Sequence, residues 1–174
     1  MRYTYLGPSG TFTESALLSV PGASDAERIP ATSVPDALAR LNAGEADAAM
    51  VPIENSVEGG VSATLDAIAA SEGVRIIREV LVPIRFVLVA AKLLSIEDVK
   101  TISTHSHAWA QVRGWAQENV PTAAYLPGSS TAAAAVGLLD AGCPYDAAFC
   151  SPALGNYHPG LHVIQATIGA NMNA

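Results

Sequence analysis

Basic residues, cysteines and long hydrophobic runs are all scarce in this sequence of 174 residues. Nine Lys and Arg stand against sixteen Asp and Glu, which gives a formal charge of −7 at pH 7. This balance argues against nucleic acid or an anionic membrane as a partner, because both are bound by basic surfaces. No apolar run approaches the roughly 18 residues of a membrane span, and no signal peptide precedes the strand pattern that begins almost at Met1. We therefore expect a cytoplasmic protein.

The two cysteines and four histidines form no recognisable metal site. Cys143 and Cys150 do not make a CxxC pair, and we interpret both as reduced structural thiols. His158 and His162 form no metal-ligand set with the other histidines. The sequence also lacks a nucleotide-binding glycine loop and a Ser-His-Asp order. It therefore predicts no metal site.

Two alanine-rich segments about a hundred residues apart repeat one another. Thr32-Ser33, followed by Asp47-Ala48-Ala49, aligns with Ser130-Thr131, followed by Asp146-Ala147-Ala148. Each copy has the pattern of a hydroxyl-bearing turn, an alanine-rich helix ended by Gly, and a strand. Alternating strands and helices favour parallel sheets with right-handed crossovers. The sequence therefore predicts an α/β fold of two similar lobes, with ligands between the lobes at the carboxyl ends of strands.

One loop gathers polar side chains at the point where an apolar run stops. Residues 47–51 have the pattern of a short buried strand, and residues 62–68 have that of a helix. Glu54, Asn55 and Ser56 lie in the loop between them. Glu54 can act as an acid if it is partly desolvated, or it can fix the loop. The alternative is a polar turn whose glycines only permit unusual dihedral angles.

A hydroxyl group precedes the first predicted helix. Thr11 and Glu14 have capping-box spacing, so Thr11 can cap a helix over residues 12–20 while Glu14 reaches back to the backbone N–H of Thr11. The free amides of that turn, beside Gly7 and Gly10, form a natural receptor for a carboxylate. Helix capping alone is the alternative.

A second hydroxyl cluster precedes the helix pattern of residues 132–139. One of Ser129, Ser130 and Thr131 is expected to cap that helix, and the others can face a ligand. His105 follows a predicted strand and can donate a hydrogen bond to a ligand or orient a neighbour. Capping or core packing is expected for three side chains of the helix after it: His107, Trp109 and Trp115.

Four blocks together resemble the catalytic domain of prephenate dehydratase, in register over nearly all of the chain. The blocks are Tyr5-Leu6-Gly7-Pro8-Ser9-Gly10-Thr11-Phe12, Val51-Pro52-Ile53-Glu54-Asn55-Ser56-Val57-Glu58-Gly59-Gly60-Val61, Thr104-His105 with Gln111, and Ser129-Ser130-Thr131-Ala132-Ala133-Ala134. That family converts prephenate to phenylpyruvate with loss of carbon dioxide and water, and it needs no cofactor. The resemblance implies a small dicarboxylate substrate and a homo-oligomer.

The resemblance also implies a two-lobed fold with a central cleft, similar to type II periplasmic binding proteins. The whole chain, residues 1–174, is then one catalytic domain. Lobe 1 is expected to comprise about residues 1–77 together with 165–174, and lobe 2 about residues 78–164. The chain is expected to cross between the lobes within Ile76–Ala90.

The site residues follow from the same resemblance. Dehydration of prephenate expels the ring hydroxyl as the ring carboxylate leaves as carbon dioxide, so the enzyme has to protonate the departing oxygen and hold the substrate. The residues expected to be catalytic are Glu54, Asn55, Ser56 and His105. The residues expected to bind substrate are Thr11, Gly10, Gly60, Ser129, Ser130 and Thr131, and no metal is expected.

No arginine lies in these blocks, although the substrate is an anion. Each arginine is expected to be a solvated surface charge: Arg2, Arg28, Arg40, Arg75, Arg78, Arg85 and Arg113. The family usually supplies an arginine in a Thr-Arg-Phe motif, and Ile168–Ala174 matches the approach to it, with Ala170 where Asp is usual.

The sequence ends about one residue short of that motif. We expect a chain truncated before Thr-Arg-Phe and before the ACT regulatory domain that commonly follows, so no feedback site is assigned. One alternative is a natural variant, such as a decarboxylase that leaves prephenate non-aromatic. The others are a dehydratase acting on arogenate and an inactive module that binds a small anion.

Overall fold

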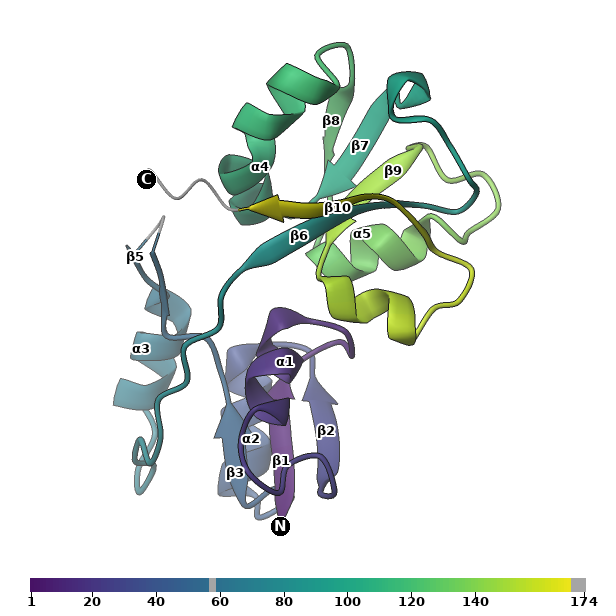
Figure 1. The fold of residues 1–174 in the computed structure, drawn as a ribbon. Helices are drawn as coiled ribbons and strands as arrows, with labels where there is room; N and C mark the ends of the chain where they lie inside the picture. The colour runs from purple at the N-terminus through teal and green to yellow at the C-terminus, as the bar shows by residue number, and fades with distance from the viewer. Residues whose placement is uncertain (57–58, 170–174) are drawn as a thin grey trace. The chain divides into compact units, whose positions relative to one another are not determined.

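The structure is a computed structural model, and it describes residues 1–56 and 59–169. The contacts between Cα atoms divide the chain into two compact units. Unit 1 is Met1–Pro83, and unit 2 begins at Ile84. Each unit contains both helices and strands (Figure 1). The α/β fold class predicted from the sequence is confirmed.

Unit 1 is built around a three-stranded parallel sheet in the order β2-β1-β3. The strands are β1 (Arg2–Leu6), β2 (Glu27–Ala31) and β3 (Ala48–Met50). Helix α1 (Phe12–Leu18) connects β1 to β2, and helix α2 (Val34–Asn42) connects β2 to β3. Because these two connections run in opposite directions along the sheet, right-handed crossovers place the helices on opposite faces.

Three short elements follow β3. Strands β4 (Glu54–Asn55) and β5 (Gly59–Gly60) form a two-stranded antiparallel ladder, and helix α3 (Ser62–Ala69) comes directly after it. The helix predicted to open at residue 62 is confirmed. Residues 54 and 55 form a short strand where the sequence predicts a loop. Residues 70–83 contain no helix or strand.

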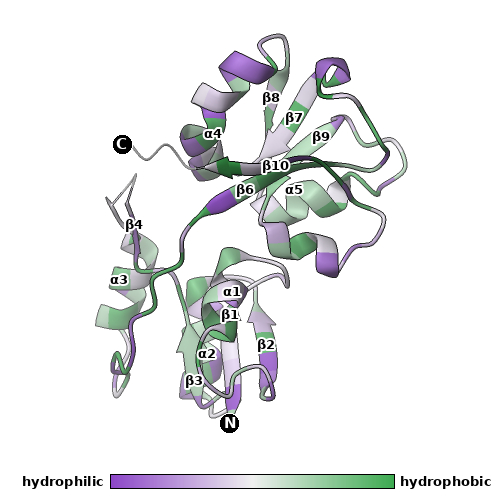
Figure 2. Cartoon of the chain, in the orientation of Figure 1, coloured by the Kyte–Doolittle hydropathy of each residue, from purple (hydrophilic) through white to green (hydrophobic). Residues whose placement is uncertain are grey.

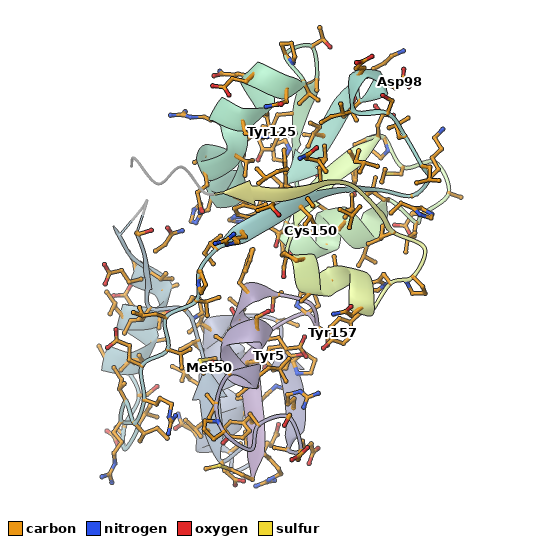
Figure 3. The ribbon with its side chains drawn as sticks, in the orientation of Figure 1. Tyr5, Met50, Asp98, Tyr125, Cys150 and Tyr157 are labelled. Atoms are coloured by element: carbon orange, nitrogen blue, oxygen red, sulfur yellow. The ribbon has the colours of Figure 1, made fainter. Side chains whose placement is uncertain are left out.

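One part of the core of unit 1 lies between α1 and the sheet. Tyr5 of β1 and Leu17 of α1 are fully buried together with Ala23. Tyr3 lies two residues before Tyr5 and therefore points to the same face of the sheet. Met50 of β3 packs against this cluster as well, and Figure 3 labels it beside Tyr5. This packing fixes the end of β1 from which the next loop starts.

Unit 2 contains a five-stranded mixed sheet in the order β10-β6-β9-β7-β8. Strand β7 is parallel to β8 and β9, whereas β6 is antiparallel to β9 and β10. The strands are β6 (Arg85–Ala90), β7 (Thr101–Thr104), β8 (Ala124–Pro127), β9 (Ala147–Cys150) and β10 (His162–Gly169). The helices are α4 (Ser106–Asn119) and α5 (Thr131–Gly137), with the 3₁₀ turns η1 (Ile96–Asp98) and η2 (Pro152–Asn156).

The core of unit 2 is apolar and partly aromatic. Residues 86–90 of β6 are all buried, and Figure 2 shows this strand mainly in hydrophobic green. Phe149 of β9 is fully buried, with its ring centroid 5.8 Å from that of Trp115 and 6.4 Å from that of Trp109. Trp109 stacks on Tyr125 at 4.4 Å. The core packing predicted for the two indoles is confirmed.

The three parallel strands of each unit share one order, which confirms the predicted repeat. In each unit the first parallel strand lies between the second and the third. Ser33 caps α2 and Ser130 caps α5, with φ of −154° and −155° respectively. The predicted register is wrong by one residue, because it aligned Ser33 with Thr131. The structure equates Ser33 with Ser130.

The end of the described chain belongs to unit 2. Residues 165–169, which the sequence assigns to lobe 1, extend β10: Gln165 pairs with Leu88 and Ile168 with Phe86. They stay in unit 2 because β6 offers β10 a free edge for hydrogen bonding. The rest of that segment, residues 170–174, lies outside the described residues.

Candidate functional site

The first group of predicted site residues follows β1 in unit 1. Thr11 is the N-cap of α1: its Oγ1 accepts the N–H of Glu14 at 3.3 Å and donates to the carbonyl oxygen of Leu6 at 3.2 Å. Gly10 is buried with φ of 84°, and its N–H donates to Oε2 of Glu14 at 2.6 Å. These groups therefore hold the loop itself, and the N–H of Gly10 is already used within the protein.

The predicted capping box is only half formed. The N–H of Glu14 reaches Thr11 as the spacing predicts, but the carboxylate of Glu14 does not return to the N–H of Thr11. It turns inward instead, because Gly10 offers Oε2 a short bond and the hydroxyl of Tyr5 donates to Oε1 at 3.1 Å. Glu14 is only 3% exposed, so it is an interior residue rather than a helix-surface one.

Arg28 is half-buried, against the prediction of a solvated surface charge. Its Nη1 donates to the carbonyl oxygens of Ala23 at 3.1 Å and Ser24 at 2.8 Å. Its Nε lies 4.0 Å from Oε1 of Glu14, and 27% of the Arg28 side chain is exposed. The two charges lie on different elements, α1 and β2, so no helical or strand spacing in the sequence links them.

The second group of site residues lies on the β4–β5 ladder. Glu54 pairs with Gly60, and Asn55 pairs with Gly59, which has φ of 81°. Glu54, Ser56 and Gly60 are exposed, and Asn55 is half-buried. The exposed polar side chains of this turn, which belong to unit 1, are therefore accessible to a ligand.

Two hydrogen bonds close the base of this turn. The N–H of Val61 donates to the carbonyl oxygen of Ile53 at 2.9 Å. The hydroxyl of Thr64, which is fully buried in the first turn of α3, donates to the carbonyl oxygen of Pro52 at 2.6 Å. The turn thus starts and ends on a fixed base, and no pattern in the sequence indicates the part played by Thr64.

His105 is the first predicted residue of unit 2 and follows β7 directly. It is the N-cap of α4, and its Nδ1 accepts the N–H of His107 at 3.3 Å. In the neutral ring the proton is then on Nε2, which makes this atom the donor. The rings of His105 and His107 also meet edge to face at 4.8 Å. His105 is therefore oriented as a hydrogen-bond donor.

The hydroxyl cluster of unit 2 follows β8. Oγ of Ser130 accepts the N–H of Ala133 at 2.9 Å and caps α5, so the prediction that one hydroxyl of this cluster caps the helix is confirmed. Thr131 is the first residue of the helix and is half-buried, whereas Ser129 is exposed.

Tyr125 of β8 supports the loop that carries His105. Its hydroxyl donates to the carbonyl oxygen of Thr104 at 3.2 Å, and its ring stacks on Trp109. Burial raises the pKa of Tyr125 above its ordinary value of 10.0, so the phenol stays a donor at neutral pH. The side chain, labelled in Figure 3, was not among the predicted residues.

Within each unit, the predicted residues gather at one edge of the sheet. β1 and β3 are parallel neighbours, so residues 10–11 and residues 54–56 both follow carboxyl ends of strands in unit 1. β7 and β8 are parallel neighbours as well, so His105 and residues 129–131 share the corresponding edge in unit 2. This is the edge at which open α/β sheets bind ligands.

The rest of the described chain offers fewer groups that could bind or react with a ligand. Among residues 1–56 and 59–169, no group of three or more His, Cys, Asp or Glu side chains is placed to hold a metal ion. In the same part of the chain, no helix is both long and apolar enough to cross a membrane. An open groove of about 540 Å³ lies between α2 and α3, but it is mainly apolar and none of the predicted site residues lines it.

These observations define an α/β protein that carries hydroxyl, amide and imidazole groups at the carboxyl ends of parallel strands in each of its two units. The family model for prephenate dehydratase matches residues 3–174. The chain belongs to the prephenate dehydratase family.

Curated and solved relatives agree with this assignment. A prephenate dehydratase of Amycolatopsis methanolica is 43% identical over 158 residues, which cover 91% of this chain and 50% of the relative. The structure of prephenate dehydratase from Arthrobacter aurescens in complex with L-Phe is 62% identical, covers 100% of this chain and 57% of its own, and aligns with a TM-score of 0.94.

A more distant structure has the same fold. Prephenate dehydratase from Staphylococcus aureus subsp. aureus Mu50 is 25% identical and aligns with a TM-score of 0.68, over 97% of this chain and 61% of its own. The chain spans about half the length of the curated relatives it matches.

Proposed function

We propose that the protein converts prephenate to phenylpyruvate, with loss of water and carbon dioxide, in phenylalanine biosynthesis. Membership of the family over residues 3–174 is the observation that carries this proposal. In the reaction, the bond from the ring to its carboxylate breaks and its electron pair forms a ring double bond. The carbon–oxygen bond to the ring hydroxyl breaks, and one proton turns the departing group into water. No electrons are gained or lost overall, so the reaction needs no redox cofactor.

The departing hydroxyl has to receive a proton. We assign this step to the catalytic group of Glu54, Asn55, Ser56 and His105. Glu54 is exposed on the turn, and Nδ1 of His105 accepts the N–H of His107, so a carboxyl group and an imidazole are the two groups of this set able to carry the proton. Asn55 and Ser56 are assigned the ring carboxylate or the ring hydroxyl.

The substrate has two carboxylates, whereas the chain has a net charge of −7. Local hydrogen-bond donors, rather than the overall field, must therefore bind it. We assign this role to the hydroxyls of Ser129, Ser130 and Thr131 and to the backbone N–H of Thr11, because the hydroxyl proton of Thr11 is already donated to Leu6. For Gly10 the structure supports a conformational contribution, since its N–H is donated to Glu14 and its φ is 84°, and Gly60 is assigned to substrate binding together with the hydroxyls.

The proposed setting is a homo-oligomer in the cytoplasm. Cys143 and Cys150 are both free thiols, which fits a reducing compartment. Ile76, Ile77 and Leu81 are 64%, 72% and 87% exposed in the segment without helix or strand. Three large apolar side chains so close together on the surface favour contact with another protein surface.

The test is a direct assay of turnover. The purified chain, and a version extended to the natural stop codon, are incubated with prephenate, and phenylpyruvate is followed by its enol absorbance in alkali. We expect phenylpyruvate from the extended form at least. Failure of both forms to make it would overturn the proposal.

The same assay separates the alternatives. A non-aromatic keto acid as the product would identify a decarboxylase, and faster turnover of arogenate than of prephenate would identify an arogenate dehydratase. Binding of prephenate without conversion by either form would identify a small-anion-binding module.

A further inference from the structure

A buried carboxylate lies beneath the loop that carries Gly10 and Thr11. Glu14 Oε2 accepts the N–H of Gly10 at 2.6 Å, and Oε1 accepts the hydroxyl of Tyr5 at 3.1 Å. The hydroxyl of Tyr5 is also 2.9 Å from Oγ of Ser9. One side chain of α1 therefore connects strand β1, through Tyr5, to two residues of the loop.

Arg28 provides the charge that balances Glu14. Its Nε is 4.0 Å from Oε1 and has no hydrogen-bond partner within the described part of the chain. The guanidinium is held in place by the carbonyl oxygens of Ala23 and Ser24. A carboxylate removed from water is costly unless donors and a cation surround it, and here two donors and one guanidinium do so.

The N–H of Gly10 is the point at which this network acts on the loop. Gly10 directly precedes the helix cap Thr11 and has φ of 84°, a region that only glycine adopts freely. Glycine has the greatest backbone freedom, so the loop needs a specific bond to keep one conformation. The short bond from Gly10 to the Glu14 carboxylate supplies it.

We propose that Glu14 is a positioning residue, which fixes Gly10 and thereby the adjoining backbone of Thr11 for the substrate, and that Arg28 keeps the Glu14 carboxylate in place. The inference rests on the proposed function, which assigns Thr11 to substrate binding. Because Glu14 is only 3% exposed, it acts through the loop and does not touch the substrate itself.

The first test compares Glu14→Gln with Asp47→Asn. Both changes remove the charge of a carboxylate that accepts a backbone N–H in unit 1, but Asp47 bonds to Arg2 at the amino end of the sheet, far along β1 from Gly10. In the extended protein, with each variant assayed at the same interval below its Tm, we expect Glu14→Gln to lower kcat/KM for prephenate at least tenfold. Asp47→Asn should change it less than twofold. Equal values for the two variants would overturn the proposal.

The second test does not depend on turnover. The short N–H···O bond should give Gly10 a strongly downfield amide proton and slow hydrogen exchange in NMR spectra of the chain. Glu14→Gln should move that resonance upfield and speed its exchange at least tenfold, whereas Asp47→Asn should leave both unchanged. A Gly10 amide that does not respond to Glu14→Gln would overturn the positioning role, whatever the activity.

Tyr5→Phe serves as the variant most certain to fold, because it removes one hydroxyl and keeps the ring in the core. It should shift the Gly10 resonance in the same direction by a smaller amount, and no shift at all would count against the network. If the wild-type protein fails to convert prephenate while Gly10 responds as expected, the proposed function falls and the link from Glu14 to the loop stands. If turnover is normal and the Gly10 amide does not respond to Glu14→Gln, the proposed function stands and the link from Glu14 to the loop falls.

Discussion

Asp47 of unit 1 and Asp146 of unit 2 make the same contact. Each lies just before the third parallel strand of its unit and accepts a backbone N–H from the first residue of the first parallel strand. The N–H of Arg2 donates to Asp47 at 2.7 Å, and that of Thr101 donates to Asp146 at 3.0 Å. The two aspartates fasten the amino ends of the sheets, and the predicted site residues occupy the carboxyl ends.

The contact of Asp47 predicts a specific loss of stability in acid. The backbone hydrogen bond from Arg2, followed by its side-chain hydrogen bond, lowers the pKa of Asp47 below the ordinary 3.8. A lowered pKa in the folded state adds stability above the unfolded value, and this stability disappears as the pH falls through the folded value. Asp47→Asn should thus be less stable than wild type at neutral pH, and the difference should shrink below pH 3.8. Urea unfolding midpoints measured across this range check the prediction, and a gap that widens in acid would contradict it.

A comparison of the equivalent helix caps Ser33 and Ser130 distinguishes an effect on stability from an effect on activity. Each hydroxyl accepts a backbone N–H in the first turn of its helix, so Ser33→Ala and Ser130→Ala should each cost about 1 kcal/mol of unfolding free energy. Only Ser130 is assigned to substrate, so only Ser130→Ala should also raise KM for prephenate. Chemical unfolding and steady-state kinetics on both variants provide the comparison. A similar KM in both would remove Ser130 from the site.

Asn55→Ala tests the turn of unit 1. If Asn55 contacts the charge that develops as the ring hydroxyl departs, its removal should lower kcat by about a hundredfold. Stability should change little, because the side chain is half-buried on a surface turn. Asn42→Ala, on the exposed end of α2, is the matched control and should leave kcat unchanged. Near-normal turnover of Asn55→Ala would exclude a catalytic contact.

The two thiols should differ sharply in reactivity. Burial raises the pKa of Cys150 to about 12, so almost none of it is thiolate at neutral pH, and the thiolate is the reactive form. Cys143 is half-buried, and its S–H donates to the carbonyl oxygen of Tyr145 at 3.4 Å. A chromogenic disulfide should therefore label only Cys143 in the native chain and both cysteines after unfolding. Cys143→Ser should abolish native labelling, and rapid labelling of that variant would contradict the prediction.

The exposed apolar segment should govern self-association. Ile77→Lys places a charge beside Ile76 and Leu81, and a charge in an apolar contact opposes its burial. We expect sedimentation velocity to show a smaller average mass for this variant at equal concentration. Leu93→Lys is the control, because Leu93 is 83% exposed but lies in unit 2. Equal dissociation by both variants would show that the segment has no special part in association.

Local patterns in the sequence predicted helices and strands better than they predicted which side chains contact one another. The repeat was recognisable because the alanine-rich helix, its terminal glycine and the following Asp-Ala-Ala recur. The predicted alignment of the two repeats is wrong by one residue at residues 129–131, because any of three consecutive hydroxyl side chains could cap the helix. In the structure, Pro30 pairs with Tyr5 and Pro127 pairs with Thr104, and counting from these prolines gives Ser33 and Ser130.

The network around Glu14 was outside the reach of such patterns. Capping-box spacing fixes where the Glu14 backbone lies, but its side chain could choose between the N–H groups of Thr11 and Gly10. That choice depends on Tyr5 and Arg28, which lie on two different strands. Arginine is usually solvated, so only the folded chain distinguishes Arg28 from the rest.

The two sheets differ in when they can be completed during synthesis. All three strands of the unit 1 sheet have been made once Met50 is added. In unit 2, by contrast, β6 and β10 are neighbours, although they lie at opposite ends of that unit's sequence. A nascent chain is synthesised from its amino end. One edge of β6 therefore stays unpaired until β10 has been synthesised as far as residue 169. During that interval β6, whose residues 86–90 are apolar and buried in the finished fold, has an unpaired edge at which mispairing can occur.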